Sequence, residues 1–202
     1  CIGWAYCDAD GNLREHGQIP LEMGLPPNQQ NAQITNTCLQ IQQLANKYAC
    51  PVVIENLDFS KKKEVLREKG QKYSRMLSSW AYNLFSEKLE AILNNRGIEL
   101  IIVNPAYSSL IALVKYVRMY GLASDEAAAL VIARRGMKLS ERLPRSLTAY
   151  PLVKKGKHVW SAWNQLNKLI KSWDAIQCRH DYYSIRVSNW ESLVKPQCEY
   201  KD

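Results

Sequence analysis

Two short apolar runs, each set between helical patterns, constrain the fold of this 202-residue chain more than any other feature. The run Val52-Val53-Ile54 follows a proline and is too short for a helix, and residues 98–103 (IELIIV) form a second run after Gly97. Continuous apolar runs are typical of strands buried on both faces of a parallel sheet, and parallel strands need helical crossovers. The chain is therefore expected to fold as an α/β protein with a layered sheet.

Turns and apolar periodicity predict the other elements. Residues 2–8 are mostly apolar, and Asp10-Gly11 turns them into residues 12–19, which favours an antiparallel hairpin. Apolar residues recur at helical spacing in four further segments, residues 34–47, 77–92, 110–120 and 159–173. Ser124 can cap one more helix. The sequence thus predicts a mixed sheet, with the hairpin beside the parallel strands, flanked by helices.

The character of the chain changes beyond Arg142. Two prolines and a lysine cluster at residues 154–157 are typical of a linker, and the amphipathic pattern over 159–173 follows it. The tail after that pattern shows no lasting period and is expected to be irregular. We therefore expect one domain over residues 1–142 and a basic helical C-terminal extension over residues 143–202.

Membrane and secretory signals are not visible in the sequence. No apolar stretch approaches the roughly 20 residues of a membrane span, and no charged stub precedes an apolar run at the start. None of the six cysteines stands in a CxxC or CxxH spacing, and Cys38 and Cys50 occupy apolar positions. Reduced cysteines that act as small hydrophobes suit a reducing compartment. We expect a cytoplasmic protein without membrane attachment and without a zinc ribbon.

The net charge of +8 is distributed unevenly along the chain. Residues 1–60 carry 2 basic and 6 acidic side chains, residues 61–75 carry 7 and 2, and residues 141–202 carry 11 and 6. This segregation suits an acidic site flanked by surfaces that hold phosphates, and therefore a polyanionic partner. A solvated lysine face without a partner is the alternative interpretation.

Two acidic residues stand at positions that differ from those expected of acids exposed on the surface. Glu55 ends a predicted buried strand, where functional groups of α/β sheets gather, and Asp125 opens a helix of small residues that could approach the sheet closely. Neighbouring carboxylates raise one another's pKa unless a hard cation neutralises them, and Mg²⁺ accepts oxygen ligands. Such ions can activate water for phosphodiester hydrolysis. The alternative is that both acids only cap their elements.

Four motifs follow one another along the first 142 residues. They are Ile2-Gly3-Trp4-Ala5 with Asp10-Gly11-Asn12-Leu13, residues 53–59 (VIENLDF), residues 103–109 (VNPAYSS), and residues 125–129 (DEAAA) with 132–135 (IARR). In this order and spacing they resemble the RuvC-like nuclease domain of the OrfB/TnpB family of transposon proteins, which is related to the type V CRISPR effectors. The resemblance implies an RNase H-like fold and, in active members, an RNA-guided DNA endonuclease that needs Mg²⁺ or Mn²⁺.

The resemblance also assigns the acids. By position in the motifs, Glu55 matches the second catalytic acid and metal ligand and Asp125 the third, with Glu126 as the alternative if the register shifts by one. The first family acid lies on a strand upstream of Cys1, so the chain is expected to be truncated and inactive alone. Asp8 and Asp10 belong to the hairpin and are expected to be turn residues rather than metal ligands.

Basic residues gain a candidate role from the same resemblance. Guide RNA and target DNA become the expected partners, together with possible transposition or CRISPR-associated proteins.

Many relatives carry paired CxxC motifs before the third acid, but residues 107–124 hold no cysteine, so the chain resembles a branch without the ribbon and no zinc is expected. The candidate phosphate-binding residues are Lys61, Lys62, Lys63, Arg67, Lys69, Lys72, Arg75, Lys115 and Arg118.

Three interpretations therefore remain for the function. The first is the RuvC-like domain of a guided endonuclease, and the second is a guided DNA-binding protein whose metal site is incomplete. An Asp at the missing upstream position would favour cleavage, whereas Asn, Ala or Gly would favour binding alone. The third is a transposition accessory factor whose C-terminal helix docks on a partner. Trp160, Trp163 and Trp173 lie on one apolar stripe of that helix, so core packing is expected rather than stacking on bases.

Overall fold

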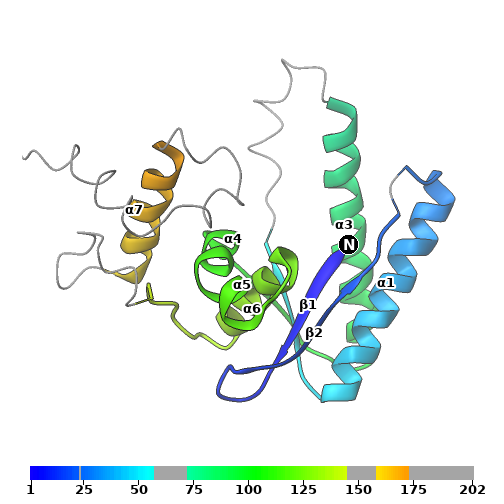
Figure 1. Ribbon diagram of the computed structural model, residues 1–202. Coiled ribbons are helices and arrows are strands. Elements are labelled where there is room, and N and C mark those ends of the chain that lie inside the picture. Colours follow the sequence, from blue (N-terminus) through cyan, green and yellow to red (C-terminus); the bar gives the residue numbers. More distant parts are fainter. Residues whose placement is uncertain (23, 57–71, 145–157, 173–202) are drawn as a thin grey trace, which may run out of the picture. The chain divides into compact units, whose positions relative to one another are not determined.

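The computed structural model describes residues 1–22, 24–56, 72–144 and 158–172 (Figure 1). The chain divides into two compact units. The first comprises Cys1–Ala106 and Ala129–Leu139, and the second comprises Tyr107–Ala128 and Ser140–Asp202. Each unit is therefore built from two separate stretches of sequence, a division that differs from the boundary near residue 142 suggested by composition.

The described strands lie in the first unit and form two pairs. Strand β1 (Ile2–Cys7) pairs antiparallel with β2 (Leu13–Ile19), and β3 (Val52–Glu55) pairs parallel with β4 (Leu100–Val103). These pairs confirm the predicted hairpin and parallel strands, and with the helices they make an α/β fold. In the described part of the chain the pairs are two separate two-stranded sheets, whereas the sequence predicts one mixed sheet.

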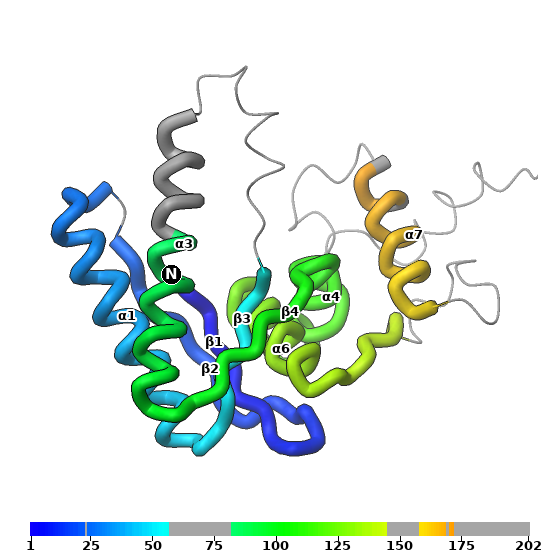
Figure 2. The backbone as a smooth tube through the Cα atoms, turned by 180° about the vertical axis from the view of Figure 1, so that it is seen from behind, coloured from blue at the N-terminus to red at the C-terminus, as the bar shows by residue number. Residues whose placement is uncertain are grey.

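Two long helices cover the parallel pair. Helices α1 (Pro27–Tyr48) and α3 (Lys72–Asn94) run side by side in Figure 1, and Figure 2 shows β3 and β4 adjacent to each other. The buried residues at the centre of this packing are Ile34, Cys38, Leu89 and Leu93, with Val52, Ile54 and Leu100 packed against them. Because each fully buried aliphatic side chain contributes about 1.5–3 kcal/mol, this cluster fixes the strands against the helices.

Cys38 is the cysteine at the centre of this cluster. Its side chain is fully buried, and its thiol donates a hydrogen bond to the backbone carbonyl of Phe85 at 3.7 Å. Burial raises the pKa of the thiol to about 11, so it stays protonated at neutral pH. Cys38 therefore acts as a small buried hydrophobe, as predicted.

The second unit contains a helical segment interrupted by a π-helical turn. It consists of α4 (Ser108–Ile111), the π-helical η2 (Ala112–Tyr116) and α5 (Val117–Tyr120). The sequence predicts one helix over residues 110–120, and the π turn is the difference. The buried apolar residues of this segment are Ile111, Ala112, Leu113, Val114 and Tyr116.

Helix α7 (Val159–Ser172) is the predicted amphipathic helix of the C-terminal extension. Trp163 is only 1% exposed, which confirms core packing for this residue, whereas Trp160 is 37% exposed. Trp173 lies outside the described residues, as do residues 145–157 of the linker predicted beyond Arg142 and the tail.

Helix α6 (Ser124–Gly136) contributes to both units, with residues 124–128 in the second and residues 129–136 in the first. Among the helices in the described ranges, none has the length and apolarity needed to cross a membrane.

Candidate functional site

Glu55 is held at its backbone and has no described partner at its side chain. It is the last residue of β3 and stands opposite Val103 in the parallel register, and the next amide, Asn56 N–H, donates to the Val103 carbonyl at 2.8 Å. The Tyr82 hydroxyl donates to the Glu55 backbone carbonyl. Within the described ranges, no hydrogen bond or ion pair reaches the half-buried carboxylate, and burial raises its pKa. The charged form of Glu55 is therefore disfavoured where it stands.

The end of α6 lies close to the same strand. Side chains alternate along a strand, so Glu55 projects to the same face of β3 as Val53. A Cβ atom built on Gly136 would lie 2.5 Å from Cγ2 of Val53 and 2.8 Å from Cγ1. This approach is too close for any residue with a side chain, so Gly136 sets the distance between α6 and the strand that carries Glu55. The small residues after Asp125 predict close helix packing, but they do not single out Gly136.

Two adjacent arginines in the last turn of α6 hold two loops of the first unit. Arg134 donates to the backbone carbonyl of Gly11 in the β1–β2 turn. Arg135 donates to the carbonyl of Asn104 and, at 3.0 Å, to that of Ala106. The sequence analysis did not predict these roles. The signal in the sequence was that the two arginines (IARR, residues 132–135) and both loops that they contact (residues 10–12 and 104–107) belong to the same set of motifs.

The first turn of α6 separates the roles of its two acids. The helix begins at Ser124, so Ala123 takes the position before it, and the Glu126 carboxylate accepts a hydrogen bond from the Ala123 N–H at 3.0 Å. Glu126 is only 9% exposed and serves as a capping side chain. Asp125 is half-buried in the same turn. Glu55 belongs to the first unit and Asp125 to the second.

Asp8 is a turn residue, as predicted. Its carboxylate accepts hydrogen bonds from the N–H groups of Asp10 at 3.1 Å and Asn12 at 2.8 Å, and it forms an ion pair with Arg14 at 2.6 Å. These hydrogen bonds, above all that from the Asn12 backbone, lower the pKa of Asp8. Gly11 completes the turn with φ +79°, a conformation that glycine adopts without strain.

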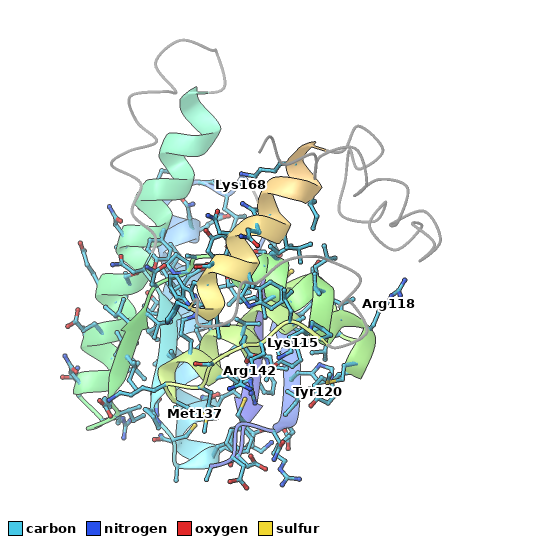
Figure 3. The ribbon with its side chains drawn as sticks, turned by 90° about the vertical axis from the view of Figure 1, so that its left-hand side faces the viewer. Lys115, Arg118, Tyr120, Met137, Arg142 and Lys168 are labelled. Atoms are coloured by element: carbon cyan, nitrogen blue, oxygen red, sulfur yellow. The ribbon has the colours of Figure 1, made fainter. Side chains whose placement is uncertain are left out.

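Of the predicted phosphate-binding residues, Lys115 and Arg118 lie in very different surroundings. Lys115 forms an ion pair with Glu141, and the two side chains are 15% and 6% exposed. The Tyr116 hydroxyl donates to the same carboxylate at 2.7 Å. Arg118 is exposed and points away from the helix (Figure 3). Lys115 therefore has a structural partner in Glu141, whereas Arg118 lies at the surface.

The other predicted basic residues are only partly covered. Lys72 and Arg75 lie in the first turns of α3, and their side chains lie outside the description. The residues outside the described ranges altogether are Lys61, Lys62, Lys63, Arg67 and Lys69.

In the part of the chain that the structure describes, no three His, Cys, Asp or Glu side chains form a group that could hold a metal ion. A comparison of the chain with protein-family models, with curated proteins and with solved structures found no match.

Proposed function

We propose that this chain is the RuvC-like domain of an RNA-guided DNA endonuclease related to the OrfB/TnpB family, with an RNase H-like fold. The four motifs support the proposal, and one structural observation carries it. The Glu55 carboxylate is half-buried at the carboxyl end of a parallel strand, and no described residue neutralises it. An ionisable group with a perturbed pKa at that place in an α/β fold is typical of a functional site.

Glu55 and Asp125 are the residues proposed to hold Mg²⁺ or Mn²⁺. Carboxylate oxygens are hard donors of the kind these ions bind, and a cation would relieve the unfavourable charge of Glu55. The ion, when bound, supplies activation of water and charge stabilisation at the phosphodiester. The chain itself fixes the Glu55 backbone through the β3–β4 register and the hydrogen bond from Tyr82.

Basic residues are proposed to hold the phosphates of guide RNA and target DNA in the cytoplasm, while base pairing reads the sequence. Arg118 and the lysine-rich segment over residues 61–75 are the candidates. Lys115 instead has a structural role, because it forms a buried ion pair with Glu141.

The test uses the full-length protein loaded with its guide. Glu55→Gln removes the charge of the proposed metal ligand and keeps its shape. Glu99→Gln is the matched control, because Glu99 is an exposed glutamate just before β4. Outer-shell changes at metal sites cost about 10–100-fold, so loss of a ligand should lower Mg²⁺-dependent cleavage by about 100-fold or more. Guided DNA binding should stay unchanged.

Cleavage by Glu55→Gln at the rate of Glu99→Gln would overturn the assignment of Glu55. Guided binding by the unmodified protein without any cleavage would instead assign the DNA-binding interpretation.

A further inference from the structure

Arg135 is the described side chain that holds the backbone just beyond the strand partner of Glu55. Its guanidinium donates to the carbonyl of Asn104 and, at 3.0 Å, to the carbonyl of Ala106. Asn104 directly follows Val103, and Val103 stands opposite Glu55 in the β3–β4 register. The first Arg135 contact is therefore at the residue directly after the strand partner of Glu55.

The turn that Arg135 contacts is also closed from the other side. The Asn104 side-chain oxygen accepts a hydrogen bond from the Ala106 N–H at 2.8 Å, while Arg135 takes the carbonyls of the same two residues. A guanidinium is planar and carries five donors, so it can serve two carbonyls together, whereas the ammonium of lysine is a single point charge. The turn after β4 is thus fixed through an N–H donor, that of Ala106, and through two carbonyl acceptors, those of Asn104 and Ala106.

Gly136 directly follows Arg135 and lies close to the strand that carries Glu55. It brings the end of α6 against Val53, two residues before Glu55 on the same strand. The adjacent Arg134 points to a different loop, as expected for neighbouring helical residues, which differ in direction by about 100°. The last turn of α6 therefore contacts both strands of the pair, at Val53 and just after Val103.

We infer that Arg135 is a positioning residue for the Glu55 carboxylate, acting through the turn of residues 104–106 and the register of β4 against β3. The inference rests on the proposed function, in which Glu55 is a metal ligand. Arg135 does not touch the metal in this account. It restricts the backbone from which the ligand extends, and small displacements of ligands weaken metal binding.

The test compares Arg135→Gln and Arg135→Lys in the full-length protein by titration with Mn²⁺, followed by electron paramagnetic resonance. Positioning predicts weaker Mn²⁺ binding in both variants, by about tenfold, because neither glutamine nor lysine has the guanidinium fork that can hold two carbonyls together. A pure charge effect predicts the opposite for Arg135→Gln, since removing a positive charge favours a cation, and no change for Arg135→Lys. Arg96→Gln, in the exposed turn after α3, is the control and should bind Mn²⁺ as the parent does.

A second measurement does not depend on metal. Amide hydrogen exchange at Asn56 and Ala106 should become about tenfold faster in Arg135→Gln, while the amides of α1 keep their protection. Unchanged exchange at both amides, or unchanged Mn²⁺ affinity in both Arg135 variants, overturns the inference. If the unmodified protein shows no Mn²⁺ binding that Glu55→Gln removes, the proposed function fails instead, and the exchange rates alone decide whether Arg135 fixes the end of β4.

Discussion

Gly136, the last residue of α6, is expected to tolerate no larger side chain. The Cβ of an alanine would lie 2.5 Å from Cγ2, 2.8 Å from Cγ1 and 3.2 Å from Cβ of Val53. Valine is stiff at χ1 and cannot rotate both methyl groups away, so the helix or the strand must move. Overpacking costs about 1–3 kcal/mol in general, and two contacts below 3.0 Å place this case at about 2–3 kcal/mol, of which the helix propensity of alanine recovers about 1 kcal/mol. Gly136→Ala should therefore lower the free energy of unfolding by about 1–2 kcal/mol.

The assay is urea unfolding followed by circular dichroism, with Val53→Ala as the second arm of a double-mutant cycle. Val53→Ala alone should also destabilise, because it leaves a cavity. The double variant should be more stable than the sum of the single effects predicts, by about 1 kcal/mol, since the methyl groups that collide with the alanine are gone. A Gly136→Ala protein as stable as the parent, or strictly additive effects, would refute the close approach of α6 to β3.

Two further predictions concern buried charges. Glu141→Gln leaves the poorly solvated Lys115 without its counter-charge and should lower the free energy of unfolding by about 3 kcal/mol. Tyr116→Phe removes only a hydrogen bond to the same carboxylate and should lower it by about 1 kcal/mol. Equal urea midpoints for the two variants would contradict this difference. Because burial raises the pKa of Glu55, its ionised form destabilises the folded protein above that pKa, and protonation relieves the penalty as the pH falls. Glu55→Gln should therefore unfold at higher urea than the parent at pH 7 and at the same urea near pH 4, and a stability gain that persists at pH 4 would exclude this cause.

The elements were predictable where apolar periodicity marks them, and their ends less so. The hairpin, both parallel strands and α7 lie where the sequence predicts them. Helix α1 begins at Pro27 rather than near Ile34, because its first turns are mostly asparagine and glutamine and carry no apolar stripe. Proline at the first position of a helix is favourable, but after another proline it equally indicates a turn.

The candidate site was predictable only in part, because its supporting contacts are distant in sequence. Glu55 could be placed at a strand end from the apolar run before it. The bond from Arg134 to Gly11 spans 123 residues, and that from Arg135 to Asn104 spans 31, and no local pattern indicates either. Lys115 resembles any surface lysine until the fold brings Glu141 to it.

The interleaving of the two units has a consequence for how the protein is made. The first unit needs residues 129–139, which leave the ribosome only after residues 107–128 of the second unit. At about 5–20 residues per second, synthesis of residues 107–139 takes about 2–7 s. During this time the hairpin, α1 and the parallel pair lack residues 129–139, which complete the first unit. A nascent chain that stops near residue 106 therefore exposes the face of β3 that Gly136 would cover, and becomes a substrate for chaperones and proteases.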